Sequence, residues 1–251
     1  MIKTFSMTDV GMKRKINQDY VFTSEEAVGN LPNLFVVADG MGGHNAGEVA
    51  SRMTTMLVKD SIIQKFDPKL STVECGEMIK RAFIDANAEI FEYSRHHKEA
   101  EGMGTTASLG FIYKNKLITA HVGDSRVYTV TDAEIRQITT DHSYIQELLR
   151  IGSITPEEVK NHPQKNIITR AIGTEPTIKV DVNISDYKGE TVFICSDGLS
   201  NLVSDEQIFE VINANDDLQM AMVELVELAN RKGGNDNITC LAFDLDGEEK
   251  I

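Results

Sequence analysis

Most features that mark other protein classes are missing from this chain. Its 251 residues include no tryptophan and five prolines, and no apolar run approaches the ~20 residues that a membrane-spanning helix needs. The N-terminus has no apolar stretch of signal-peptide form, so we expect a cytoplasmic protein without membrane insertion. No Pro/Ser-rich linker, low-complexity tract or internal repeat is visible, so residues 1–251 are expected to form a single domain.

Cysteine is scarce as well. Cys75, Cys195 and Cys240 form no CxxC pair, and an odd number of cysteines fits a reducing compartment. Cys195 and Cys240 lie in apolar runs, which is typical of core residues and not of nucleophiles. The sequence therefore excludes a disulfide-stabilised secreted domain and offers no activated thiol.

Basic residues are outnumbered by acidic ones, 25 to 39, which gives a formal net charge of −14 and a pI of about 4.9. Nucleic acids and anionic membranes both require basic patches, so neither is expected as a partner. Most of the acidic excess is explained by the solubility that charged surface residues provide. We also expect the protein to be a monomer. A few carboxylates gathered in one place would instead require a bound divalent cation.

Hydrophobic periodicity predicts a mixed α+β domain. Strands are predicted at 3–8, 20–23 and 33–38, at several places within 105–138, and at 191–195 and 238–243. Helices are predicted from 46, over 73–97 and 143–150, from 155 and over 216–231. Another is predicted from 205, with Ser204 and Gln207 as the capping box that opens it. Turn signals at 114–115 and 131–132 favour antiparallel pairing. Two groups of strands and two helix pairs predict two stacked, mainly antiparallel sheets flanked by helices, an α-β-β-α layered sandwich.

The stretch 151–169 is polar and irregular, which is typical of a surface excursion beside a site. Within it, Thr155 and Glu158 form a capping-box helix start with Pro156 at the first helical position. A segment over about 145–170 is therefore expected to leave the layered domain as a flap.

Four aspartates occupy turn-like positions: Asp19 in RKINQD, Asp39 in ADGMGG, Asp197 in SDG and Asp236 in GGNDN. A single aspartate at such a position usually forms part of a turn or caps a helix. Asp39 and Asp197, however, end hydrophobic runs and precede glycine, so buried strands would deliver both carboxylates to a sheet edge. Oxygen ligands without paired His or Cys select Mg²⁺ or Mn²⁺ over Zn²⁺, and Gly40 would let its backbone carbonyl reach an ion. The pattern indicates a divalent metal site.

The ordered set RKINQD, ADGMGGHNAGE, GTT, GDSR, DHS, SDG and GGNDN resembles the metal-dependent Ser/Thr protein phosphatases of type 2C, most closely the small bacterial members. The resemblance runs from Thr8 to Asn237. GTT and GDSR are weak signals alone, whereas the ordered set is specific. The resemblance implies hydrolysis of phosphoserine and phosphothreonine by in-line attack of a water or hydroxide that bridges two Mn²⁺ or Mg²⁺ ions.

The resemblance also implies a ligand set. Asp39 would bridge the two ions, Gly40 would give its carbonyl to one, and Asp197 and Asp236 would hold the other. Asp124 in GDSR matches a residue that, with Asp197, binds a third and more weakly held ion in the family. The alternative role of Asp124 is that of a hydrogen-bonded aspartate in a turn. Asp141 in DHS is expected to be structural, or else to orient ordered water.

Further roles follow from the same match. Arg14 stands five residues before Asp19, where the family carries its phosphate-binding arginine, and a planar guanidinium suits bidentate contact with phosphate. Asp19 would order metal waters or orient Arg14 without binding an ion itself. Gln18 stands where many eukaryotic relatives have Glu, so no carboxylate ligand is expected there. His44 is the candidate acid for the leaving alkoxide, and a metal-bound water is the alternative.

The expected partners are phosphorylated protein substrates and, because bacterial relatives commonly oppose a transmembrane Ser/Thr kinase, a cognate kinase of that type. Two other functions stay open. A metal phosphodiesterase or nucleotidase is one, although no P-loop or Rossmann glycine pattern supports nucleotide binding. A non-catalytic metal-binding or regulatory module is the other; it would require a lost ligand or a lost Arg14, and neither is missing.

Overall fold

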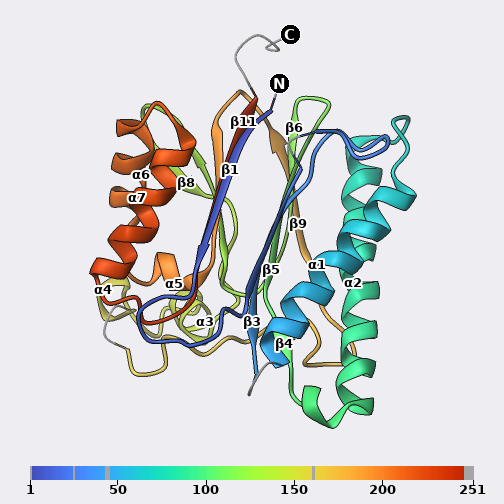
Figure 1. Ribbon diagram of the computed structural model, residues 1–251, viewed down its shortest axis with the longest axis horizontal. Helices are drawn as coiled ribbons and strands as arrows, with labels where there is room; N and C mark the ends of the chain where they lie inside the picture. Colours follow the sequence, from blue (N-terminus) through green and yellow to red (C-terminus); the bar gives the residue numbers. More distant parts are fainter. Residues whose placement is uncertain (1, 25, 43–45, 160–161, 246–251) are drawn as a thin grey trace.

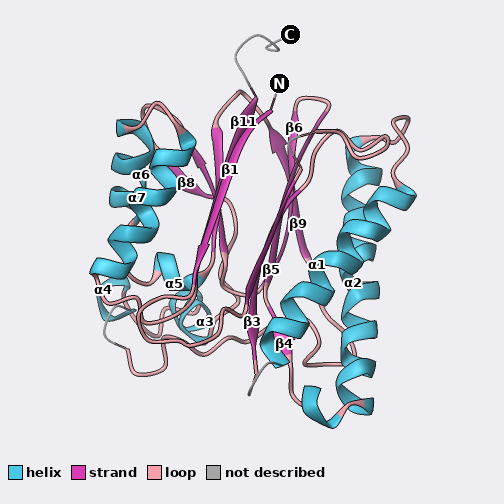
Figure 2. Ribbon diagram, viewed as in Figure 1, coloured by secondary structure: helices cyan, strands magenta, loops and turns pink. Residues whose placement is uncertain are grey.

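Two antiparallel β-sheets are stacked face to face in the computed structural model, which describes residues 2–24, 26–42, 46–159 and 162–245. A pair of helices covers the outer face of each sheet (Figures 1 and 2). The predicted α-β-β-α arrangement is confirmed. None of the helices in the described ranges is long and apolar enough to cross a membrane.

The first sheet contains both ends of the described chain. Its strands, in spatial order, are β1 (Ile2–Asp9), β11 (Ile238–Leu245), β10 (Thr191–Cys195), β7 (Arg126–Val130) and β8 (Ile135–Gln137). Helices α6 (Asp205–Ala214) and α7 (Leu218–Arg231) pack on its outer face, and the short helix α5 (Asp197–Ser200) directly follows β10. Cys195 and Cys240 are buried in this layer and unpaired, as predicted.

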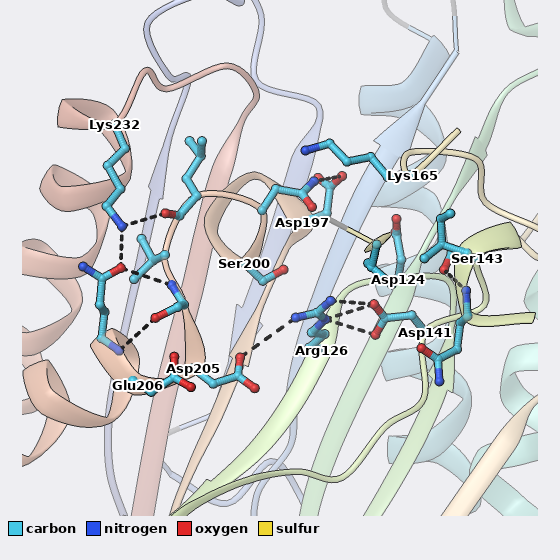
Figure 3. A pocket seen from close by; sticks show the side chains of 18 residues that line it. Asp124, Arg126, Asp141, Ser143, Lys165, Asp197, Ser200, Asp205, Glu206 and Lys232 are labelled. Carbon is cyan, nitrogen blue, oxygen red and sulfur yellow. Dashed lines mark hydrogen bonds and ion pairs between the residues drawn. The ribbon is translucent and has the colours of Figure 1, made fainter. Parts of the chain in front are cut away.

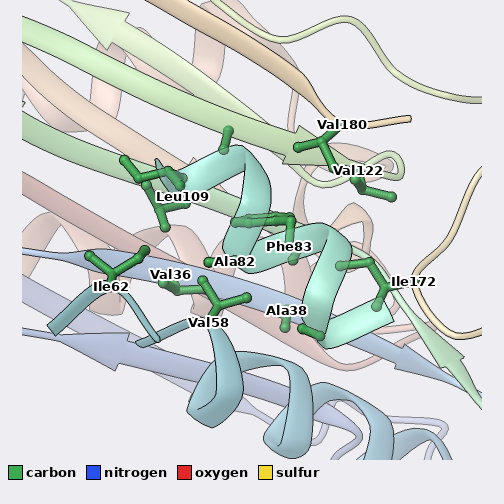
Figure 4. Close-up of a cluster of buried hydrophobic side chains, with 14 of the residues drawn as sticks. Val36, Ala38, Val58, Ile62, Ala82, Phe83, Leu109, Val122, Ile172 and Val180 are labelled. Atoms are coloured by element: carbon green, nitrogen blue, oxygen red, sulfur yellow. The ribbon is translucent and has the colours of Figure 1, made fainter. Parts of the chain in front are cut away.

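The second sheet has the spatial order β2 (Asp19–Thr23), β3 (Phe35–Met41), β5 (Ala107–Tyr113), β6 (Lys116–Val122) and β9 (Asp181–Asp186). The two-residue strand β4 (Gly104–Thr105) extends the pairing of β3. Helices α1 (Ala46–Lys65) and α2 (Thr72–His96) cover the outer face, and a short 3₁₀ helix, η1 (Lys98–Ala100), follows α2. Figure 4 shows the apolar layer between these helices and the sheet, with Phe83 at its centre.

Local sequence signals begin and end these elements. Lys114 and Asn115 both have positive φ, 49° and 56°, which is the conformation of a two-residue hairpin turn between β5 and β6. Ser204 and Gln207 form the predicted capping box at the start of α6. The two predictions are confirmed at the residue level.

Strand β9 and helix α5 are among the elements that were not predicted from the sequence. Strand β9 carries only Val182 and Ile184 as apolar residues and lies at a sheet edge, so its sequence pattern is weak and its pairing with β6 supplies the order. Helix α5 is a single turn that begins at Asp197 itself. Asp39, expected at the end of its strand, lies inside β3, because pairing with β4 extends that strand to Met41.

The segment 144–167 leaves the layered domain between β8 and β9. It contains α3 (Tyr144–Arg150) and α4 (Pro156–Val159), and at the predicted start of α4 the Thr155 amide donates to the Glu158 carboxylate at 2.8 Å. Its two ends meet: the amide of Tyr144 donates to the carbonyl of Ile167 at 2.9 Å. The segment therefore leaves and returns at one place, beside the end of the sandwich where α5 lies.

The two sheets contact each other through a narrow apolar layer. The rings of Phe35 on β3 and Phe243 on β11 stack across it, with centroids 3.8 Å apart and planes 15° apart. A Cβ on Gly110 would lie 2.8 Å from the Phe243 ring, so glycine leaves the room that this stack occupies. The stack fixes the distance between the sheets and hence between the loops at their ends.

We expect Phe243→Ala to lower the free energy of unfolding by about 3–5 kcal/mol, because it removes a fully buried ring and leaves a cavity between the sheets. Urea denaturation measures this loss. Met220→Ala is the control, since Met220 is 62% exposed and should change stability by less than about 0.5 kcal/mol. Equal losses for both variants would contradict the assigned role of the stack.

Candidate functional site

The predicted aspartates come together at one end of the sandwich. Asp19 begins β2 and pairs with Asp39 on β3, Asp197 follows β10, and Asp236 precedes β11. Because β2 and β3 are antiparallel, as are β10 and β11, all four positions fall at the same edge of the stacked sheets. Asp39, Asp197 and Asp236 line one cleft of about 640 Å³, together with Arg14 and Gly40.

The backbone around Asp39 is held by the GTT segment. The Asp39 amide donates to the Thr106 hydroxyl at 3.0 Å, and its carbonyl accepts from the Thr105 hydroxyl and the Thr106 amide, both at 2.8 Å. Thr105 and Thr106 are buried. A motif that looked weak in the sequence therefore fixes the strand position of the central carboxylate.

Asp19 connects the two sheets. It is buried, and its Oδ2 accepts a hydrogen bond from the Ser196 hydroxyl at 2.8 Å, across from the end of β10. The Ser196 hydroxyl in turn accepts from the Thr239 amide at 3.0 Å. The second oxygen of Asp19, Oδ1, is buried without a hydrogen-bond partner. Ser196 was not singled out from the sequence, although its place directly before Asp197 in SDG was the available signal.

Gly40 must be glycine for a packing reason as well as for access. A Cβ there would lie 2.1 Å from the carbonyl oxygen of Gly47 in α1 and 2.5 Å from that of Gln18. The Gly40 amide donates to the Gln18 carbonyl at 3.1 Å. The glycine thus lets α1 and the start of β2 approach β3, and it leaves the Gly40 backbone at the wall of the cleft.

Asp197 occupies the first turn of α5 and accepts from the Asn201 side chain at 3.0 Å. It lines the cleft and also a neighbouring cavity of about 530 Å³, whose wall includes Asp124. Lys165, from the 144–167 segment, lines both spaces, and Figure 3 places its side chain beside Asp197. The two cavities therefore adjoin, and Asp197 lies between them.

Asp124 is buried in the neighbouring cavity, and its Oδ1 has no hydrogen-bond partner. It does not line the cleft that holds Asp39 and Asp236. Arg126, in the same cavity wall, donates to both oxygens of Asp141, at 2.8–3.1 Å, and lies 4.0 Å from Asp205 (Figure 3). Asp141 therefore has the structural role expected for it, as the partner of the arginine in GDSR.

Arg14 reaches the cleft from the loop between β1 and β2. Its Nη2 lies 2.8 Å from Oδ2 of Asp236, and the two side chains are 50% and 38% exposed. The guanidinium carries five N–H donors and uses one of them here, so most of its hydrogen-bonding capacity faces the cleft and solvent. Lys13 and Lys15 do not line the cleft.

Burial raises the pKa of several of these carboxyl groups, and their mutual repulsion raises it further. The pKa of Asp19 is raised to about 7 and that of Asp124 to about 8, first by burial and then by neighbouring carboxylates, Asp197 foremost. The pKa of Asp39 is raised well above its ordinary value by burial and by Asp19, and that of Asp197 by burial and by Asp236. Arg126 lowers the pKa of Asp124 and Arg14 that of Asp197, but burial and the neighbouring carboxylates outweigh both arginines.

The residues fit a divalent cation by two observations. The donor set is all oxygen, and Asp19 and Asp124 each bury a carboxylate oxygen that no protein group satisfies. Across the described ranges, no group of three His, Cys, Asp or Glu side chains lies close enough together to hold an ion. The individual ligand assignments of Asp39, Gly40, Asp124, Asp197 and Asp236 therefore stay predictions, and His44 lies outside the described residues.

Known proteins are similar to this chain over nearly its whole length. The sequence model of protein phosphatase 2C matches residues 8–238. The serine/threonine phosphatase stp of Listeria monocytogenes serotype 4b is 37% identical over 246 residues, which are 97% of this chain and 96% of that protein.

Two solved structures are similar over nearly the whole chain. Serine/threonine phosphatase Stp1 from Staphylococcus aureus superposes with a TM-score of 0.91 at 31% identity, covering 98% of this chain and 96% of that one. The catalytic domain of the serine threonine protein phosphatase PstP, in complex with two manganese ions, gives 0.82 at 32% identity over 97% of each chain. This chain belongs to the protein phosphatase 2C family.

Proposed function

We propose that the protein is a Mn²⁺- or Mg²⁺-dependent phosphatase that hydrolyses phosphoserine and phosphothreonine in proteins. The observation that carries the proposal is the group of carboxylates with raised pKa at one end of the sandwich, beside the half-exposed Arg14. The family match and the manganese bound to PstP support it. A proton or a divalent cation would relieve the repulsion, and at neutral pH the cation is the more effective of the two.

In this proposal Asp39, Gly40, Asp197 and Asp236 hold two ions, and Asp124 with Asp197 holds a third and weaker one. The bound ions supply electrostatic stabilisation and a nucleophile that is active near neutral pH. The protein's own groups position the reactants. Arg14 binds the phosphate through its free N–H donors, and Asp19, whose other oxygen is fixed by Ser196, would order the water around the ions or orient Arg14.

The leaving alkoxide needs a proton, for which His44 or an ordered water is the proposed source. The 144–167 segment borders the cleft through Lys165 and Asn166, and we assign it to contact with the substrate protein as a flap. A Ser/Thr kinase that phosphorylates the same substrates is the proposed functional counterpart. No feature of the cleft favours a nucleotide over a phosphorylated side chain.

We expect Asp39→Ala and Asp236→Ala each to reduce the Mn²⁺-dependent hydrolysis of a phosphothreonine peptide by about 10²-fold or more, because each removes a predicted ligand of the ions. Initial rates with and without added Mn²⁺ measure this. Asp186→Asn is the control. Asp186 lies on the edge strand β9, away from the cleft, and pairs with Lys116 of β6. The loss of this ion pair should leave the rate unchanged.

Three outcomes would contradict the proposal. Hydrolysis that needs no metal, or that survives both substitutions, would exclude the ligand set. Inactivity on the peptide combined with cleavage of a nucleotide diester would favour the phosphodiesterase alternative. Mn²⁺ binding by calorimetry with no hydrolysis of either substrate would favour a non-catalytic module.

Arg14→Ala should raise KM for the phosphopeptide by about 10- to 100-fold, because a charge-assisted hydrogen bond to phosphate is lost while the carboxylates remain. Steady-state kinetics at saturating Mn²⁺ provide the measurement. Lys13→Ala is the matched control on the same loop and should change KM by less than about twofold. A similar change in both variants would mean that the loop contributes only general positive charge.

The stability of the metal-free protein should fall as pH rises from about 6.5 to about 8. Asp19 and Asp124, whose pKa values are raised to about 7 and about 8, keep protons in the folded state that the unfolded chain has already released. Folding then becomes less favourable by about 1.4 kcal/mol per pH unit for each such proton. His121, with a pKa lowered to about 3, acts in the opposite sense only below about pH 6.5.

Thermal unfolding in EDTA across this pH window tests the expectation. Mn²⁺ binds the folded state selectively, so its addition should raise the midpoint most at the upper end of the window. Asp39→Asn should flatten the pH dependence, because it removes one member of the repelling group. A midpoint that rises with pH in EDTA would contradict the assigned electrostatics.

A further inference from the structure

The loop over residues 10–18 carries Arg14 from β1 to β2, and a single amide side chain holds both of its ends. Nδ2 of Asn237 donates to the carbonyl of Val10 and to that of Ile16, both at 2.9 Å. Its Oδ1 accepts from the amide of Gln18, also at 2.9 Å. Asn237 is 5% exposed, so the three backbone groups that it satisfies are shielded from water.

The same amide reaches the walls of the cleft in two directions. Asn237 follows Asp236 directly, and its own backbone amide donates to Oδ1 of Asp236 at 2.9 Å. In the other direction, the carbonyl of Gln18 accepts from the Gly40 amide at 3.1 Å and from the Ser51 hydroxyl at 2.6 Å. A residue that does not itself line the cleft therefore connects the Arg14 loop to both sides of the site.

Other contacts also hold the start of the loop, and near its end Nδ2 of Asn17 donates to the Thr8 hydroxyl at 2.8 Å. The amides of Met12 and Lys13 donate to the carbonyl of Gly234 at 2.8 and 3.2 Å. A Cβ on Gly11 would lie 2.1 Å from the carbonyl oxygen of Asp236, so the chain passes very close to the aspartate there. In the second half of the loop, the Asn237 side chain bonds two backbone groups, the Ile16 carbonyl and the Gln18 amide.

We propose that Asn237 is the positioning residue for phosphate binding: by bonding both ends of the 10–18 loop it fixes the direction in which Arg14 presents its guanidinium to the cleft. This inference rests on the proposed function, in which Arg14 binds the substrate phosphate. A guanidinium binds phosphate bidentately only in a narrow range of orientations, so a loosened loop reduces affinity even when Arg14 itself is intact.

An amide is the side chain that suits this position. The Val10 and Ile16 carbonyls need donors and the Gln18 amide needs an acceptor, and asparagine supplies both donors and the acceptor within one short side chain. Aspartate keeps the acceptor but faces two carbonyls with a carboxylate. Serine retains one hydroxyl and can serve one of the three groups.

The experiment measures inhibition of phosphopeptide hydrolysis by inorganic phosphate, at saturating Mn²⁺, for the wild-type protein and for Asn237→Ala, Asn237→Ser, Arg14→Ala and the double variant. We expect Asn237→Ala to raise Ki for phosphate about tenfold, and Asn237→Ser to raise it less. In the Arg14→Ala background the further effect of Asn237→Ala should fall below about twofold, because the residue acts through Arg14.

Trypsin provides a second readout that needs no activity. Lys13, Arg14 and Lys15 are all trypsin sites on this loop, so a loosened loop should be cut there several times faster than in the wild-type protein. Asn33→Ala is the matched control: Asn33 is a buried amide with two backbone hydrogen bonds to Ile112, far from the cleft in the β3–β5 region. It should lower stability without changing Ki or the cleavage rate at residues 13–15.

Each outcome separates the possibilities. An unchanged Ki, an equal effect of Asn237→Ala with and without Arg14, or the same changes in Asn33→Ala would overturn the positioning role. If Asn237→Ala does not fold, Asn237→Ser carries the test under the same criteria. If the wild-type protein hydrolyses no phosphopeptide, the proposed function fails instead, and the trypsin comparison still decides whether Asn237 holds the loop.

Discussion

Repulsion between carboxylates that are held out of water is the constraint on which the functional end of this protein depends. Two unit charges about 4 Å apart repel by about 4 kcal/mol at an effective dielectric constant of 20, whereas a whole domain is stable by only about 5–15 kcal/mol. The group formed by Asp19, Asp39, Asp124 and Asp197 cannot therefore stay fully ionised without compensation. The raised pKa values express the same fact as a preference for protons, and a divalent cation would offset the same charge while the carboxylates stay ionised.

Neutral hydrogen-bonding groups keep these carboxylates in place. Thr105 and Thr106 hold the backbone of Asp39, and Ser196 holds the side chain of Asp19 from the opposite sheet. A hydroxyl or an amide can position a carboxylate without cancelling its charge, which a lysine or an arginine would do. The Phe35–Phe243 stack then sets the spacing of the two sheets from which these groups project.

The sequence predicts best what is encoded locally. The Lys114–Asn115 turn and the Ser204 capping box depend on residues next to each other, and both were predicted correctly. Strand β9 was missed because its order comes from pairing with β6. The Ser196–Asp19 bond joins residues 177 positions apart, and no local pattern marks it. The aspartates themselves could be identified because strands and glycines around them constrain the direction of the chain, whereas their supporting partners come from distant segments.

The pairing of Arg14 with Asp236 has to be weighed against the two roles proposed for these residues. Both side chains are more than one-third exposed, and ion pairs of that kind contribute typically about 0–1 kcal/mol. A divalent cation among carboxylates and a phosphate on a guanidinium are both stronger interactions. The pair is therefore weak enough to yield to either ligand. An ion that binds the Asp236 carboxylate would weaken the ion pair between Asp236 and Arg14. Occupation of the metal site would therefore leave the guanidinium freer to bind the phosphate.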